Sequence, residues 1–356
     1  MGRRRNLIIL LTCVVSAAIP SAGPAWAQPD PEIAYSIGVS PTQTDVVTAT
    51  LDGTVLHRFV DIEEFTAIDN GIVAVTRHSD TYHSRIVGFD ATTGERRFTV
   101  RDARLPLLAA NGRGLVFQPD NAEDFTQDER DPFIQSVWYR DLASGNEFKL
   151  AQFFTPDHYI LEKAVSAQGD RVAFTRGNNT FLFKWNVWVV NSDGTGLLRL
   201  THDEISNYPS FRPDGEKLAI SKLNEGRCRG ALATIRIDGS DEHVFFESTC
   251  AMDLQRPIWI GQHRVVTVWW RHDAQGNRPV GLAIVHVPTG EVHPIVRGYI
   301  SDVAVSRPLG QVVFRRGIGI GRVGLYRIDT GEASYLPMTG EEIVRVEIDG
   351  AYEDAV

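Results

Sequence analysis

Four histidines stand in segments that the sequence predicts as loops, and imidazole nitrogens can bind a divalent metal ion. His78 and His83 bound a short polar segment, His202 lies in THDE, and His272 lies in RHDAQ. None of the four has the spacing of a metal-ligand motif. The sequence therefore leaves three interpretations open: unrelated exposed side chains, a ligand surface, or a metal site assembled from distant segments.

Aromatic and arginine side chains occur in the same class of predicted loops. Such side chains are common anchors of binding surfaces when they are exposed. Trp269 and Trp270 are an exception, because they are adjacent in a predicted strand. Strand alternation predicts that their rings pack on opposite faces of the sheet. The predicted binding residues are His78, His83, Phe183, Trp185, His202, Arg227, Arg271 and His272.

The acidic segment QPDNAEDFTQDERDPFIQS, residues 118–136, has enough carboxylates to hold calcium. It lacks the order of acids and the glycine of an EF-hand, so a solvated surface loop is the favoured interpretation. No G-x-S-x-G, P-loop, H-E-x-x-H or C-x-x-C motif occurs in the chain. The sequence therefore predicts no catalytic residue, no metal and no cofactor.

The N-terminus has the three parts of a secretory signal peptide. Arg3, Arg4 and Arg5 precede an apolar run, and Ala25-Trp26-Ala27 fits an A-x-A cleavage site. The apolar run is shorter than the roughly 20 residues that span a membrane. We expect cleavage after Ala27, a single domain over 28–356, and a secreted or periplasmic location without membrane insertion.

The chain is acidic, with a formal net charge of −9 at pH 7 over 356 residues. Loss of the three N-terminal arginines would make the charge more negative by three. Such a chain is poorly suited to nucleic acid or to an anionic membrane surface. The expected partner is a protein or peptide of the cell envelope, bound by a monomer.

Two cysteines remain after the predicted cleavage, Cys228 and Cys250. Between them lie two predicted strands joined by a turn at Asp238-Gly239, and 239 is the midpoint of 228 and 250. Residues equidistant from a hairpin turn face each other. In an exported protein this predicts a disulfide; the alternative is two buried free thiols.

The two strands and the turn at Asp238-Gly239 form one copy of a repeated unit. Strand–turn–strand units such as VWVVNSDGTGLLRLT (187–201) occur seven times, with successive turn glycines 41 to 51 residues apart. Two-residue hairpin turns favour Gly, Asn and Asp because they need positive φ. The turn glycines of the seven units are Gly53, Gly94, Gly145, Gly194, Gly239, Gly290 and Gly331.

A second kind of hairpin, such as YPSFRPDGEKLAISK (208–222), alternates with the first and occurs six times, with turn glycines at 71, 112, 169, 215, 261 and 310. IVRVEIDG, ending at Gly350, reads as one strand of a seventh copy, with AYSIGVS near residue 34 as its partner. Four strands per 40–50 residues is the period of a β-propeller blade. We expect an all-β propeller of seven four-stranded blades with non-covalent ring closure; six blades, or two β-sandwiches, are the alternatives.

The segment 187–222 also resembles the TolB-like propellers, whose repeat is the WD40-like PD40 repeat. Trp188, Asn191 and Asp193-Gly194 match its first hairpin, and Pro213 with Asp214-Gly215 matches its second. Phe211 and Arg212 replace the usual Trp and Ser. The sequence has no counterpart to the α/β domain that precedes the propeller in TolB, so the partner of TolB is not carried over.

These observations together predict an exported, non-catalytic binding or scaffold module. Loops between second and third strands, and connections between blades, would share one rim of the propeller and hold the partner there. The alternative function is a propeller enzyme, a lyase or glycoside-processing protein, with a His- or Asp-bound metal on that rim.

Overall fold

The structure is a computed structural model in which every regular element of the described residues is a β-strand. It describes residues 32–40, 43–62, 64–78, 84–109, 112–119, 134–154, 158–178, 184–223, 230–273, 276–317, 321–337 and 343–348. The chain divides into two compact units, Met1–Asp30 and Pro31–Val356. The predicted signal peptide lies in the first unit, outside the described residues.

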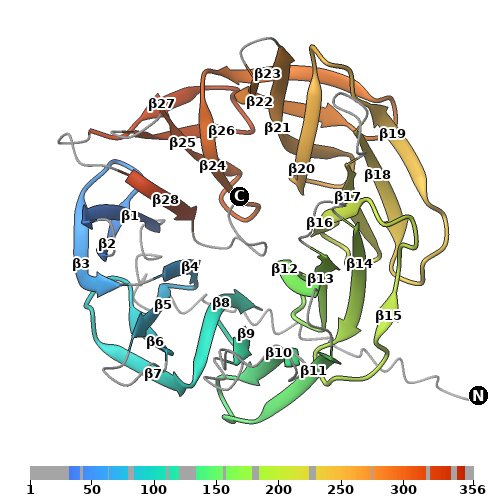
Figure 1. The fold of residues 1–356 in the computed structure, drawn as a ribbon. Coiled ribbons are helices and arrows are strands. Elements are labelled where there is room, and N and C mark those ends of the chain that lie inside the picture. Colours follow the sequence, from blue (N-terminus) through green and yellow to red (C-terminus); the bar gives the residue numbers. More distant parts are fainter. Residues whose placement is uncertain are drawn as a thin grey trace, which may run out of the picture. The chain divides into compact units, whose positions relative to one another are not determined.

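Residues 31–356 form seven four-stranded antiparallel sheets, which we call blades 1 to 7 (Figure 1). Blade 1 contains β28 (Ile343–Ile348), β1 (Glu32–Ser40), β2 (Gln43–Thr50) and β3 (Val55–Ile62). Blade 2 contains β4 (Glu64–Asp69), β5 (Ile72–His78), β6 (Ser84–Asp90) and β7 (Arg96–Arg101). Blade 3 contains β8 (Ala103–Ala109), β9 (Gly114–Pro119), β10 (Ile134–Asp141) and β11 (Glu147–Phe154).

The remaining blades repeat this order from the innermost to the outermost strand. Blade 4 contains β12 (His158–Val165), β13 (Arg171–Asn178), β14 (Lys184–Asn191) and β15 (Leu198–Arg199). Blade 5 contains β16 (Ser206–Phe211), β17 (Lys217–Lys222), β18 (Ala231–Arg236) and β19 (His243–Glu247). Blade 6 contains β20 (Asp253–Trp259), β21 (Arg264–Asp273), β22 (Gly276–His286) and β23 (Glu291–Arg297). Blade 7 contains β24 (Ile300–Ser306), β25 (Gln311–Arg316), β26 (Arg322–Arg327) and β27 (Ala333–Tyr335).

Blade 1 joins two segments that lie far apart in the sequence. β28 pairs antiparallel with β1, with Ile33 opposite Ile348 and Tyr35 opposite Val346. Blade 1 therefore takes its innermost strand from the C-terminal region and its other three from the N-terminal region, and the ring closes non-covalently (Figure 1). Seven blades and this closure are confirmed, and six blades are ruled out.

The turn glycines have the backbone conformation that the repeat predicted. All seven glycines of the outer hairpins have positive φ, from 69° at Gly290 to 90° at Gly53. Five of the six inner-hairpin glycines do so as well, and Gly261 does not. The glycines therefore located the turns, because most other residues would be strained at these φ values.

Apolar faces of neighbouring blades hold the ring together. Between blades 4 and 5, Val187 and Val189 of β14 pack with Phe211, Leu218 and Ile220 of blade 5 in one buried cluster. Trp269 packs in the cluster between blades 5 and 6, whereas Trp270 packs in the cluster between blades 6 and 7. The predicted opposite orientation of these two rings is confirmed.

Each innermost strand carries a register shift against its neighbour, which indicates a β-bulge in all seven blades. In blades 3, 5 and 6, the bulge includes a residue with positive φ: Leu105 at 53°, Tyr208 at 51° and Arg256 at 58°. The connection from blade 4 to blade 5 ends where β16 begins, at Ser206.

The acidic segment lies where the repeat placed it, between the second and third strands of blade 3, although residues 120–133 fall outside the described ones. A search of the described residues finds no helix that is both long and apolar enough to cross a membrane.

Candidate functional site

The connection between blades 4 and 5, residues 200–205, is fixed to both blades. The backbone N–H of Trp185, at the start of β14, donates to the carbonyl of Glu204 at 2.8 Å. On the other side, the N–H of Leu223, just after β17, donates to the carbonyl of Ile205 at 2.8 Å. The ends of second and third strands thus meet the interblade connection, as expected for one shared rim.

An ion pair whose side chains are largely covered holds the same connection in place. Asp203 lies 2.7 Å from Nζ of Lys222, which also contacts Glu242, and the side chains of Asp203 and Lys222 are only 27% and 14% exposed. Burial raises the pKa of Asp203, but hydrogen bonds from Lys222, Ile205 N–H and Ser206 outweigh burial and leave this pKa below its usual range. For Lys222, burial lowers the pKa, and Asp203 and Glu242 raise it above the usual range.

The connection between blades 5 and 6 is fixed in a comparable way. The backbone N–H of His272, in β21, donates to the carbonyl of Cys250 at 3.0 Å. His272 Nε2 also lies 2.6 Å from Asp253 Oδ2, and the ring N–H of Trp269 donates to the carbonyl of Ala251 at 3.1 Å. The imidazole of His272 is therefore engaged by Asp253 within the rim, and it is not exposed for binding a ligand.

The predicted binding residues divide into three groups. His83, Phe183 and Arg227 lie outside the described residues, and for His78 only its place at the end of β5 is described. Trp185 forms a bridge with Ile205 in the connection between blades 4 and 5, and the same connection contains the exposed His202. Arg271, exposed, and His272, nearly buried, lie one blade further on. The described residues thus come from separate blades of one rim and do not converge on one point.

The cysteine pair has one described member. Cys250 follows β19, and Cys228 lies outside the described residues. The β18–β19 register places Ala231 opposite Glu247 after a bulge, and Ser248 N–H donates to Gly230 O at 2.8 Å. The disulfide stays a prediction, because Cys228 is not described.

A polar cluster on three innermost strands was missed from the sequence. Arg256 Nη2 donates to the hydroxyl of Tyr208 at 3.0 Å, and its guanidinium lies 4.7 Å from the centre of the Tyr208 ring. Burial, together with the charge of Glu162, raises the pKa of Tyr208, while Arg256 opposes that rise. The three residues lie at the bulges of blades 4, 5 and 6, where simple strand alternation no longer predicts orientation.

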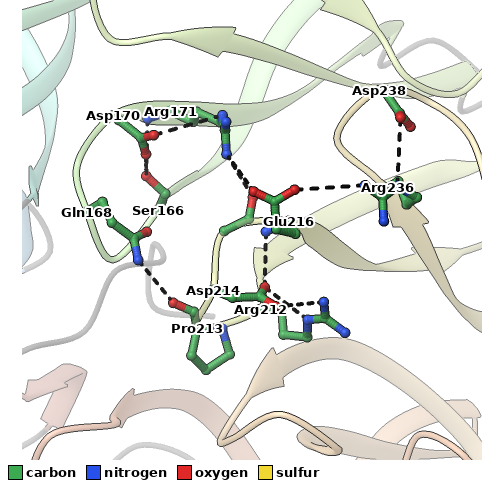
Figure 2. Close-up of polar contacts among 11 residues, drawn as sticks. Ser166, Gln168, Asp170, Arg171, Arg212, Pro213, Asp214, Glu216, Arg236 and Asp238 are labelled. Carbon is green, nitrogen blue, oxygen red and sulfur yellow. Dashed lines mark hydrogen bonds and ion pairs between the residues drawn. The ribbon is translucent and has the colours of Figure 1, made fainter.

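The opposite rim carries charges that are neutralised within the protein (Figure 2). Glu216 of blade 5 lies 3.7 Å from Arg171 of blade 4 and 3.9 Å from Arg236 of its own blade. Arg212 and Asp214 pair at 2.6 Å across the Asp-Gly turn. These contacts brace the turns of blades 4 and 5.

The described residues contain no group of three or more His, Cys, Asp or Glu side chains placed to hold a metal ion. The chemistry that the described rim offers is recognition: the exposed imidazole of His202, the exposed guanidinium of Arg271 and the partly exposed ring of Trp185 on a braced framework.

Comparison with known proteins places the fold. No protein-family model and no curated protein sequence matches the chain. Among solved structures, the tricorn protease superposes over 89% of the chain with a TM-score of 0.61 and 12% identity, and the chain spans only 36% of its length. TolB from Acinetobacter baumannii matches over 89% of the chain and 82% of its own, with a TM-score of 0.50 and 12% identity.

An oligogalacturonate lyase in complex with manganese matches over 74% of the chain and 73% of its own, with a TM-score of 0.57 and 11% identity. These similarities concern the fold, which peptidases, a lyase and TolB proteins share. In fold, the chain is a seven-bladed TolB-like β-propeller.

Proposed function

We propose that this chain is exported and acts, without catalysis, as a binding or scaffold module in the cell envelope or outside the cell. Its partner is a protein or peptide that docks on the rim formed by the interblade connections and the loops between second and third strands. The observation that carries the proposal is the bracing of this rim: connections are hydrogen-bonded to both flanking blades, while His202 and Arg271 remain exposed.

Bracing favours binding because a partner then does not bear the entropic cost of ordering loops. The backbone bonds of Glu204 and Ile205 and the Asp203–Lys222 ion pair hold one connection before any partner arrives. Neither the His202 nor the Arg271 side chain has a polar partner among the described residues, so both side chains are available to bind. At the opposite rim of blades 4 and 5, the charges of Arg171, Arg212, Asp214, Glu216 and Arg236 pair within the protein.

Export rests on the N-terminal sequence. The arginines at 3–5, the apolar run and the A-x-A site before Gln28 have the order of a cleavable signal. A TolB-like fold is compatible with a periplasmic location. We propose that the exported chain is periplasmic or secreted. The processed N-terminus of the protein purified from a native host would test this directly, with Gln28 as the expected first residue.

Capture from envelope extracts tests the proposed function. The mature chain is immobilised beside a H202A/R271A variant and a matched H243A/R264A variant, which changes two exposed residues of the same types. We expect the mature chain and the matched variant to retain a defined protein or peptide, and H202A/R271A to lose most of it. Equal capture by all three chains, or no specific capture by any, would contradict a partner on this rim.

The enzyme alternative draws on the manganese complex of the structurally similar lyase. It requires a bound divalent ion, so the metal content of the purified chain decides between the two. One equivalent of metal that is lost on changing His83 to Ala would favour the enzyme. A metal-free chain that still captures a partner supports the binding module.

A further inference from the structure

Three arginines form a row across three neighbouring strands of blade 2. In the β5–β6 register Arg77 is directly opposite Arg85, and in the β6–β7 register Arg85 is directly opposite Arg101. Directly opposed residues project from the same face of a sheet with Cβ atoms about 5 Å apart. The three arginine side chains therefore start from neighbouring positions on one face, at the end of the blade where β5 connects to β6.

Such a row is unfavourable by itself, because like charges directly opposite each other destabilise a sheet. Between blades 4 and 5, by contrast, a carboxylate neutralises two arginines, since Glu216 lies beside both Arg171 and Arg236 (Figure 2). Within the described part of the chain, Arg85 and Arg101 are exposed and have no acidic partner. Two exposed arginines without an acidic partner, on a chain of net charge −9, call for an anion from outside.

The row borders a groove of about 1120 Å³. Val87 and Phe89, which follow Arg85 on the same strand face, line its floor, and Phe98 lines it too. Arg96 adds a fourth guanidinium, against one carboxylate from Asp102. The groove thus offers a basic edge above an apolar floor and has room for several amino-acid residues.

Blade 1 fixes one end of the row. Arg77 Nη2 donates to the carbonyl of Val60 in β3 at 3.1 Å, and its guanidinium lies 5.3 Å from the centre of the Phe89 ring. The apolar floor continues into the cluster that Val87 shares with Phe59 and Ile62 of blade 1. One arginine is thus held in place, while Arg85 and Arg101 remain open to a ligand.

We propose that this groove binds an acidic peptide segment, with carboxylate side chains on the arginine row and an apolar side chain on Phe89. The row covers two strand spacings, about 10 Å, and alternate side chains of an extended peptide are about 6.6 Å apart. Two acidic residues at i and i+2 can therefore engage the row together, whereas one inorganic anion spans only part of it. The inference names the partner chemistry of the rim proposed above and rests on that function.

Fluorescence anisotropy with a labelled Glu-rich peptide tests the proposal, beside a matched peptide that carries Gln at every Glu position. The proteins are the mature chain, R85Q/R101Q, and R264Q/R297Q, which removes two exposed arginines of blade 6. We expect binding of the Glu peptide alone, weakening with salt. R85Q/R101Q should raise Kd about tenfold or more, equivalent to about 1.4 kcal/mol, and R264Q/R297Q should leave Kd unchanged.

Thermal unfolding separates a binding defect from misfolding. R85Q/R101Q should unfold at or above the temperature of the parent chain, because the change removes like-charge repulsion. Equal affinity of R85Q/R101Q and the parent chain for the Glu peptide would overturn the proposal. Displacement of the peptide by inorganic phosphate at the peptide's own concentration, or tighter binding of single-stranded DNA at the same arginines, would also overturn it.

The two proposals fail separately. If the parent chain captures an envelope partner but ignores the Glu peptide, the acidic-peptide site is refuted and the binding module stands. If the Glu peptide binds through Arg85 and Arg101 while no envelope partner is captured, the site stands and the proposed function is refuted.

Discussion

His272 Nε2 lies 2.6 Å from Asp253 Oδ2, and the two side chains are only 10% and 5% exposed. One residue comes from the second strand of blade 6 and the other begins its first strand, so the pair spans β20 and β21 directly after the connection from blade 5. Asp253 also accepts a hydrogen bond from Gln255 at 2.6 Å. The pair therefore holds β20 and β21 together at the rim. We interpret His272, which the sequence suggested as a binding residue, as a residue that stabilises the fold.

The His272→Ala variant should lower the free energy of unfolding by about 1–3 kcal/mol, because it leaves the buried Asp253 carboxylate without its partner. Urea unfolding at neutral pH measures this loss. The exposed His202→Ala change is the control, and it should stay within about 0.5 kcal/mol of the parent chain. A similar loss in both variants would mean that the contact with Asp253 contributes nothing specific.

The predicted disulfide between Cys228 and Cys250 gives a second test. If the bridge forms, Cys228→Ser should lower the free energy of unfolding by about 2–4 kcal/mol, and a reducing agent should have the same effect on the parent chain. Alkylation of the unfolded, unreduced chain should then label neither thiol. Labelling of both cysteines before reduction would refute the bridge.

Sequence reasoning succeeded where one residue type has one dominant physical reason. Turn positions such as Gly53 and Gly290 followed from the need for positive φ, and the spacing of these turns predicted seven blades. The pairing of β28 with β1 followed from a strand left without a partner at each end of the repeat. These features depend on local conformation and on counting, and tertiary packing does not alter them.

The polar contacts were less predictable. The extra residue of each bulge shifts the alternation of an innermost strand, so the meeting of Tyr208 with Arg256 is not visible in a two-residue pattern. The arginine row did leave a signal, because Arg77 and Arg85 are equidistant from residue 81, in the predicted loop between their strands. The cysteine pair was predicted by comparing residues equidistant from a turn, and the same comparison in every hairpin would have found the row.

The ion pair of Asp203 and Lys222 predicts how stability depends on pH. The pKa of Asp203 is lowered in the folded state, so its contribution is present above its usual value of 3.8 and is lost as the pH falls further. The pKa of Lys222 is raised, so its contribution is present below its usual value of 10.5 and is lost as the pH rises through the folded value. The pair should therefore stabilise the protein across the whole neutral range.

We expect Asp203→Asn to lower the free energy of unfolding by about 1–2 kcal/mol at pH 7, since it leaves a half-buried Lys222 with fewer partners. The difference from the parent chain should shrink as the pH falls below 3.8. Asp241→Asn is the matched control, because Asp241 pairs with Lys217 and its side chain is 58% exposed. A difference that does not change with pH, or an equal effect of the two variants, would contradict this role of the buried pair.

Tyr208 predicts a loss of stability in alkali. Burial and the nearby charge of Glu162 raise its pKa in the folded state above the usual 10.0. Above pH 10 the unfolded chain therefore gains phenolate before the folded chain does, so the stability that Tyr208 contributes is lost as the pH rises through the folded value. Tyr208→Phe removes this titration, and its free energy of unfolding should fall less steeply with pH than that of the parent chain. The absorbance of the folded parent chain minus that of folded Tyr208→Phe reports the phenolate of Tyr208, and we expect this difference to appear only above pH 10. A difference that appears at or below pH 10 would mean that the cluster with Arg256 stabilises the phenolate.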